Sequence, residues 1–187
     1  MDRKEQILEI ATELIQTRGY SAFSYQDLSD RLGITKASIH HHFPSKAALG
    51  RAVAERYFVD VTTALGEVKR ASDDPWDQLD GYVGQILAII KTRDRICAAG
   101  AVHSEFNVVP ESMSDEMCRL AKHIIAWITD VLEAGRRAGV MEFPGEPEAE
   151  AALVFAAAQG AMQFGRAHGA VKARQIMLQI KESLRAG

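Results

Sequence analysis

The chain has 187 residues, enough for one domain of ordinary size or for a small domain joined to a larger one. Hydrophobic residues make up 47% and charged residues 25%, which is typical of a soluble globular protein, and no apolar run is long enough to span a bilayer. The first residues, MDRKEQIL, hold acids and no apolar core, which excludes a secretory signal, and two cysteines imply no disulfide framework, so we expect a reducing cytoplasm.

The net charge of −3 is not spread evenly along the chain. Residues 1–56 hold 8 Lys and Arg against 7 Asp and Glu, whereas residues 57–187 hold 14 against 18. This small asymmetry permits nucleic-acid binding by the first segment and does not demonstrate it.

Periodicity and helix-end signals predict three helices in the first 43 residues. Apolar side chains at helical spacing mark the first helix, which should end at Gly19. Ser24, with Asp27 three residues later, predicts the start of a second helix that stops before Gly33. Thr35 is a suitable N-cap for a third helix, which cannot continue cleanly through Pro44.

Longer helices follow in the rest of the chain. The pattern predicts them over residues 46–71, 75–91, 112–138, 146–168 and 170–186. Residues 92–110 are the least regular stretch, and the segment FPGEP is expected to be a loop. We find no strand alternation and no internal repeat, so the predicted fold class is all-α with about nine helices.

Three consecutive histidines, His40, His41 and His42, lie in the third predicted helix. Successive helical residues point about 100° apart, so the three rings cannot converge on one ion, and metal-binding helices use spacings of three or four. Ile39 and Phe43 are four residues apart and define the face that must be buried. We therefore expect no metal site and no catalytic pair there.

The opposite face of the third helix carries small and hydrogen-bonding side chains. Small residues permit close approach to a major groove, and donors can reach base edges and phosphates. The residues concerned are Lys36, Ala37, Ser38, His40 and His41. A solvated face on some other helical bundle is the alternative interpretation.

Residues 18–52, RGYSAFSYQDLSDRLGITKASIHHHFPSKAALGRA, resemble the N-terminal domain of the TetR family of bacterial transcriptional regulators. The shared pattern is a Gly-aromatic turn, a Leu-Gly-Ile helix end, a Thr-Lys-x-Ser-Ile cap and a His-Phe-x-x-Lys-x-x-Leu run. The matching residues are Gly19, Leu32, Gly33, Ile34, Thr35, Lys36, Ser38, Ile39, His42, Phe43, Ser45, Lys46 and Leu49. His40 departs from the pattern, because the family usually has Tyr there.

The resemblance implies a helix-turn-helix DNA-binding domain in residues 1–50 and a ligand-binding and dimerisation domain in residues 51–187. The DNA-binding candidates are Tyr25, Gln26, Thr35, Lys36, Ala37, Ser38, His40, His41, His42 and Lys46. A phosphate beside Lys46 would offset the unfavourable position of a cation in the first turn of a helix. For Tyr25, packing in the core is an equal alternative.

The implied partners are palindromic double-stranded operator DNA, a second copy of the chain and a small-molecule effector, apolar or electrophilic, with no cofactor. The segment EAEAALVFAAAQGAMQFGRAHG is rich in Ala and Gly, which suits a tight helix–helix interface. With the helix around residues 124–132 it would form a four-helix bundle between two copies. The alternative is an internal buried helix.

Apolar and aromatic residues with a few polar groups should line the effector pocket. The candidates are Tyr82, Ile86, Cys97, His103, Phe106, Met117 and Trp127, each of which could instead be plain core. The segment CAAGAVHSEF resembles one branch of TetR regulators in which a cysteine is followed eight residues later by Glu, here Cys97 and Glu105, and some members sense electrophiles or oxidants.

The predicted function is a DNA-binding transcriptional regulator, a repressor that leaves its operator when a small molecule binds the C-terminal domain. The first alternative is a repressor switched by covalent modification or oxidation of Cys97. A remote alternative is a small enzyme that uses the histidines or Cys97. Against the enzyme, the sequence has no Ser-His-Asp, H-E-x-x-H or Gly-rich phosphate pattern.

Overall fold

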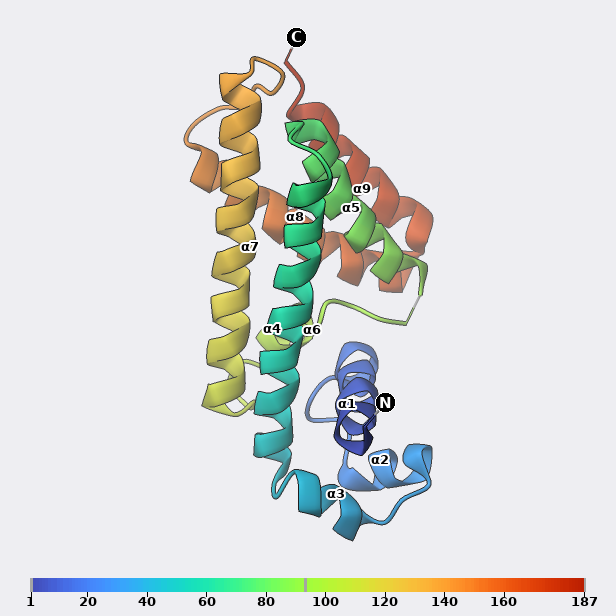
Figure 1. Ribbon diagram of the computed structural model, residues 1–187. Helices are drawn as coiled ribbons and strands as arrows, with labels where there is room; N and C mark the ends of the chain where they lie inside the picture. Colours follow the sequence, from blue (N-terminus) through green and yellow to red (C-terminus); the bar gives the residue numbers. More distant parts are fainter. Residues whose placement is uncertain (1, 93, 187) are drawn as a thin grey trace. The chain divides into compact units, whose positions relative to one another are not determined.

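The computed structural model describes residues 2–92 and 94–186, and the regular elements within these ranges are nine helices (Figure 1). They are α1 (Arg3–Arg18), α2 (Tyr25–Leu32), α3 (Lys36–His42), α4 (Lys46–Ala71), α5 (Pro75–Lys91), α6 (Ala98–Ser104), α7 (Glu111–Arg137), α8 (Pro147–His168) and α9 (Ala170–Ser183). One isolated antiparallel bridge joins Met141 to Arg185. The predicted all-α class is confirmed.

Local signals in the sequence fix several helix ends. Ser24 and Asp27 form a complete capping box at the start of α2, and the side chain of Thr35 accepts from the backbone N–H of Ser38. Asp74 accepts from two backbone N–H groups at the start of α5, whose first residue is Pro75. These groups satisfy donors that have no partner inside a helix.

Helix α6 lies within the stretch predicted to be the least regular. Its N-cap residue, Cys97, makes no side-chain capping hydrogen bond, and the helix has only seven residues, so the sequence carries no start signal. The helix instead forms through packing, since Ala98, Ala99 and Val102 are buried.

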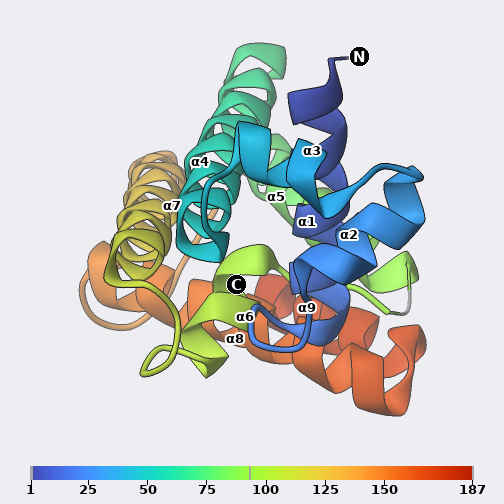
Figure 2. The ribbon, with the colours of Figure 1, turned by 90° about the horizontal axis from the view of Figure 1, so that it is seen from below.

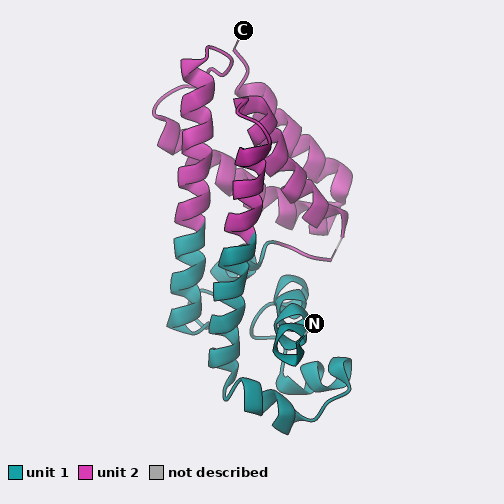
Figure 3. Cartoon of the chain, viewed as in Figure 1, with its two compact units in different colours: residues 1–60, 97–120 teal, residues 61–96, 121–187 magenta. Residues whose placement is uncertain are grey.

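The chain divides into two compact units, which Figure 3 colours separately. Unit 1 comprises residues 1–60 and 97–120, and unit 2 comprises residues 61–96 and 121–187. Helices α4 and α7 each contribute residues to both units. The division into functional domains at residue 50 stays a prediction.

Unit 1 has a core built from α1, α2, α3, α6 and the first parts of α4 and α7. In it α1 contacts α2 and α6, and α2 contacts α3; α2 and α3 lie side by side near one end of α1 (Figures 1 and 2). Its fully buried large side chains are Ile7, Leu14, Ile15, Leu28, Ile39, Leu49, Met113, Met117 and Leu120.

Unit 2 has α5, α8 and α9 packed against one another. Gly165 on α8 allows the close approach of this helix to α9 and α5, because a Cβ there would lie 2.7 Å from the Cβ of Ala173 and 3.4 Å from Ile90 Cγ2. None of the helices within residues 2–92 and 94–186 combines the length and apolar character needed to cross a membrane.

Candidate nucleic-acid interface

The segment from α2 to α3 forms a helix, a tight turn and a second helix. Gly33 ends α2 in the left-handed conformation with φ +63°. Across the turn, the backbone N–H of Ile34 donates to the carbonyl oxygen of Ser29, and the hydroxyl of Ser29 donates to the carbonyl oxygen of Ile34. Leu28, Ile39 and Phe43 are buried, which fixes how α3 is turned about its axis. The predicted buried face of α3 is confirmed.

The outer face of α3 is open in unit 1. Lys36, Ala37, His40 and His41 are exposed, while Ser38 and His42 are half-buried. The rings of His41 and His42 meet edge to face at 5.5 Å. Within the described residues, no group of three or more His, Cys, Asp and Glu could hold a metal ion.

Tyr25 is placed differently from the expectation of a DNA contact. Its side chain is only 9% exposed, and its hydroxyl donates a 2.9 Å hydrogen bond to the carbonyl oxygen of Phe43. Burial, and to a lesser extent neighbouring Tyr20, raises the pKa of Tyr25 to about 12, so the hydroxyl stays a donor. Tyr25 therefore ties the start of α2 to the end of α3 from within the core, as the alternative interpretation had it.

His40 packs on this same tyrosine. The two ring centroids are 4.6 Å apart, and Nδ1 of His40 lies 3.3 Å from the carbonyl oxygen of Pro44. If Nδ1 carries the proton that reaches this oxygen, Nε2 of a neutral ring is an acceptor. A contact of His40 with a phosphate then requires the protonated imidazole.

Lys46 at the start of α4 is held by aromatic rings. Its Nζ lies 4.6 Å from the ring centroid of Tyr20 and 4.6 Å from that of Phe23. Burial lowers the pKa of Lys46, and the carboxylates of Glu105 and Asp27 act in the opposite direction. The ammonium group of half-buried Lys46 thus lies over these two rings, and its contact with a DNA phosphate stays a prediction.

Glu105, at the end of α6, holds the turn between α1 and α2. Its carboxylate accepts from the backbone N–H of Ser21 at 2.8 Å and from the Ser21 hydroxyl at 2.5 Å. Gly19 in the same turn has φ +93°, and a Cβ there would collide with the Glu105 carboxylate. Sequence reasoning missed this contact, since 84 residues separate its partners and neither carries a local signal for it.

Comparisons with known proteins bear on this helix-turn-helix. Residues 7–53 match the model of the bacterial regulatory proteins of the tetR family. A solved structure of a TetR-family transcriptional regulator from Agrobacterium tumefaciens is 34% identical, with a TM-score of 0.94 over 98% of this chain and 97% of that one. The chain belongs to the TetR family.

Two further relatives fit this membership. The transcriptional repressor NemR of Escherichia coli K12 is 28% identical over 163 residues, 86% of this chain and 82% of the relative, and the repressor DhaR of a Mycobacterium species is 26% identical over 161 residues, covering 85% and 80%. The crystal structure of the reduced form of E. coli NemR matches with a TM-score of 0.85 at 25% identity, covering 100% of this chain and 99% of that one. TetR-family proteins are transcriptional regulators and not enzymes, so the enzyme alternative is set aside.

The candidate effector residues of this TetR-family chain fall into both units. In unit 2, Tyr82, Ile86 and Trp127 are buried, and the rings of Tyr82 and Trp127 lie 6.2 Å apart. In unit 1, Met117 is fully buried, while Phe106 is 54% exposed and so does not have the enclosed position expected of a pocket residue.

Cys97 is the N-cap residue of α6 in unit 1, and His103 lies in the last turn of this helix. Cys97 is buried, and the hydroxyl of Tyr57 donates to its sulfur at 3.4 Å. His103 is half-buried, and burial lowers its pKa. Tyr57 is a neighbour that sequence reasoning did not find, because it lies 40 residues away on α4.

Proposed function

We propose that this TetR-family regulator is a repressor that leaves its operator when a small, largely apolar molecule binds beside Trp127. The names of two relatives, NemR and DhaR, describe repressors. The exposed face of α3, with Lys36, Ala37 and His41, supplies the groove-reading surface. The observation that carries the effector part of the proposal is an indole N–H without a partner.

Trp127 lies on α7 in unit 2 and is 7% exposed. Its Nε1 is the one buried side-chain nitrogen or oxygen, among the described residues, that has no hydrogen-bond partner in the protein. A buried donor without a hydrogen bond costs about 1–3 kcal/mol of stability, so such groups are uncommon in proteins and call for an explanation. An apolar effector with a carbonyl or ether oxygen would accept this hydrogen bond while its body packs on the Tyr82 and Trp127 rings.

The test uses operator DNA selected by the protein from a random pool. Apolar carbonyl compounds are screened by fluorescence anisotropy for release of this DNA, and the most effective compound is then titrated against Trp127→Phe. This variant keeps an apolar ring and loses only the hydrogen-bond donor. We therefore expect release of DNA to require about tenfold more compound, while DNA binding without the compound is unchanged. An equal response of both proteins would contradict the role of Trp127. The coupling must also be reciprocal: operator DNA should weaken binding of the compound by the same factor by which the compound weakens binding of the DNA.

Helix α4 is the proposed lever between effector and DNA. It runs without interruption from Lys46, directly after the helix-turn-helix, to Ala71 in unit 2. A shift of its C-terminal part would tilt α1, α2 and α3 together, and in a dimer it would change the spacing of the two α3 helices.

A second candidate trigger is covalent modification of Cys97. Burial raises the pKa of Tyr57 well above its ordinary value, so this phenol remains protonated and donates to the sulfur. Electrophiles react with a cysteine at its sulfur, and the Tyr57 hydroxyl contacts the sulfur of Cys97 directly. Of the two cysteines, only Cys97 has this neighbour, since half-buried Cys118 forms no hydrogen bond of this kind among the described residues.

Helix α6 gives this trigger a short route to the DNA-binding elements inside unit 1. Cys97 is its N-cap residue and Glu105 its C-cap residue, and Glu105 holds Ser21 in the turn before α2. An adduct on Cys97 would not fit beside Ala98 and Ala99, which are buried, so α6 would have to move. Movement of α6 would pull Glu105 away from Ser21.

The experiment compares N-ethylmaleimide treatment of the wild type, Cys97→Ser and Cys118→Ser, with adducts located by mass spectrometry. If Cys97 is the trigger, the wild type and Cys118→Ser lose operator binding and Cys97→Ser retains it. In Ser21→Ala the adduct still forms, but the release of DNA that it causes is smaller. If Cys97→Ser and the wild type respond alike, Cys97 is structural and the reversible effector remains.

Dimerisation is proposed through the outer face of α8. TetR-family regulators bind operator DNA and effectors as dimers. Leu153 is 60% exposed and Phe164 40% exposed, with Ala156 and Gly160 exposed between them at helical spacing. An apolar strip with small residues at its centre permits two α8 helices to approach closely.

A further inference from the structure

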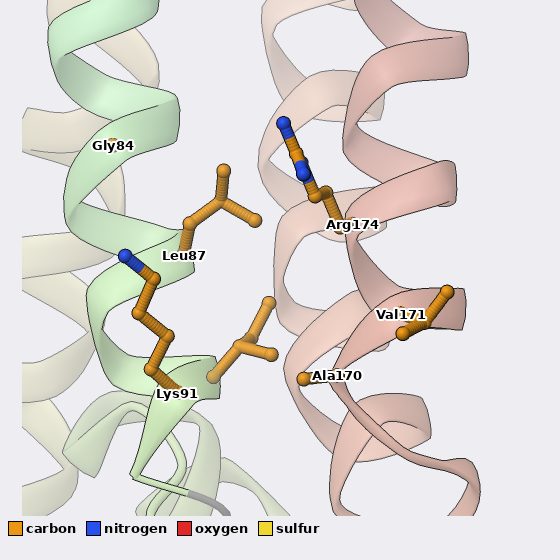
Figure 4. A pocket seen from close by; sticks show the side chains of 7 residues that line it. Gly84, Leu87, Lys91, Ala170, Val171 and Arg174 are labelled. Atoms are coloured by element: carbon orange, nitrogen blue, oxygen red, sulfur yellow. The ribbon is translucent and has the colours of Figure 1, made fainter.

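Unit 2 carries a groove between α5 and α9 that none of the residues discussed under the proposed function lines. It has a volume of about 400 Å³, within the range of small-molecule sites. Its lining residues are Gly84, Leu87, Ile90, Lys91, Ala170, Val171 and Arg174. Figure 4 shows Leu87 on α5 and Arg174 on α9 directed into the space between the two helices.

The floor of the groove is apolar. Leu87 and Ile90 come from α5, and Ala170 and Val171 from α9. Ile90 is 5% exposed, whereas Val171 is 74% exposed and offers its side chain to solvent. A Cβ placed on Gly84 would have no heavy atom within 4 Å, so the groove is open beside this residue. Apolar surface of this kind gains free energy when a ligand covers it.

Two cations, Lys91 and Arg174, complete the lining, and no acidic side chain is part of it. Neither cation has an ion-pair partner within the described part of the chain, whereas elsewhere in unit 2 Lys69 pairs with Asp130. The first turn of α9 also contains no acidic residue. The groove therefore combines exposed apolar surface with positive charge that has no counter-charge in the protein.

We propose that this groove binds an amphipathic carboxylate, with its apolar chain along Leu87, Ile90 and Val171 and its headgroup between Lys91 and Arg174. The charge of the lining selects an anionic head over a cationic one, and the apolar floor selects a hydrocarbon chain over a small inorganic anion. The site is distinct from the Trp127 and Cys97 sites, and it does not depend on which of those triggers release from DNA.

The test measures decanoate binding to the full-length protein by isothermal titration calorimetry, below the concentration at which decanoate forms micelles. The double variant Lys91→Gln/Arg174→Gln removes both positive charges and keeps the apolar floor. We expect its decanoate affinity to fall by about tenfold or more, because two charge-assisted contacts are lost. The control Lys69→Gln/Arg137→Gln removes two exposed charges elsewhere in unit 2 and should bind decanoate within about twofold of the wild type.

Two further measurements make the outcome decisive. Gly84→Leu fills the groove without touching either cation, and it should also abolish decanoate binding at this site. Decyltrimethylammonium, which has the same chain and the opposite charge, should bind the wild type at least about tenfold more weakly. The proposal is overturned if the charge-removed double variant or Gly84→Leu binds decanoate as the wild type does, or if the cationic probe binds equally well. Operator binding without decanoate, measured on the same variants, should remain unchanged.

Discussion

Lys46 has two possible partners that exclude each other, the rings of Tyr20 and Phe23 or a DNA phosphate. In the free protein its ammonium lies 4.6 Å from both ring centroids. On DNA, a phosphate beside the start of α4 would draw it outward, since charge-assisted contacts exceed cation–π contacts at partly exposed sites. The residue then contributes to affinity without reading sequence.

We expect Lys46→Ala to weaken binding to all DNA sequences and to reduce the slope of log affinity against log salt by about one. His41→Ala, on the exposed face of α3, should instead change the preference among sequences more than the overall affinity. Fluorescence anisotropy over a salt series, with selected and scrambled operators, measures both effects. A wild-type salt slope in Lys46→Ala would mean that the ammonium stays over the rings when DNA is bound.

Asp27 gives a pH-dependent prediction. Hydrogen bonds from the Ser24 hydroxyl and backbone, with a smaller effect of Arg18 at 3.0 Å, lower the pKa of Asp27 below its ordinary value. The folded state thus binds this proton less readily than the unfolded state, and the stabilisation is present above the unfolded pKa of about 3.9. It is lost as the pH falls through the lower, folded value.

Asp27→Asn should accordingly melt at a lower temperature than the wild type at pH 7, and the difference should shrink progressively below about pH 4. Thermal denaturation followed by circular dichroism between pH 7 and pH 3 measures this. Glu9→Gln, which removes an exposed charge on α1 that forms no ion pair among the described residues, is the control. A difference that is constant across the pH range would show that the capping geometry, and not the carboxylate charge, matters.

At the scale of elements, two turn glycines should respond very differently to substitution. Gly33 has φ +63°, and a Cβ added there would meet only open space, so Gly33→Ala has only the backbone penalty of the left-handed region, about 1 kcal/mol. Gly19 has φ +93° and ψ 163°, a conformation almost confined to glycine, and a Cβ would also strike Glu105. Urea unfolding should show a loss of about 3 kcal/mol for Gly19→Ala, because the backbone strain adds to the displacement of the Glu105 carboxylate from Ser21. Equal losses for the two variants would contradict this difference.

The elements that the sequence predicts well are those with short-range causes. The capping box of Ser24 and Asp27, the N-cap of Thr35 and the Asp74-Pro75 start all act within four residues. Helix α6 has no such signal, and the sequence does not predict it. The hydrogen bond that holds Tyr25 has its partner 18 residues away, so the sequence could offer core packing of Tyr25 only as one of two alternatives. The partners of the Ser21–Glu105 bond are 84 residues apart, and the sequence gives no sign of it.

At the scale of the molecule, operator recognition by a TetR-family protein requires two α3 helices at a fixed spacing. We propose that the outer face of α8 supplies the contact between copies, because it is apolar and exposed and has small residues at its centre. Ala157 is half-buried within this helix, between Leu153 and Gly160. A carboxylate introduced there would be desolvated without a partner in the dimer, at a cost of several kcal/mol.

Ala157→Glu should therefore give a monomer, or insoluble protein, and should abolish operator binding although every residue of α2 and α3 is unchanged. Multi-angle light scattering at micromolar concentration gives the mass, and anisotropy gives the DNA affinity of the same samples. Glu148→Gln, near the start of α8, changes a charge on the same helix outside the apolar strip and should remain dimeric. If Ala157→Glu is insoluble, Gly160→Arg tests the same strip. A Cβ on Gly160 meets nothing within 4 Å in the single chain, so a folded monomer can accommodate the larger side chain. A wild-type mass of one chain, or a dimeric Gly160→Arg that binds operator normally, would place the interface elsewhere.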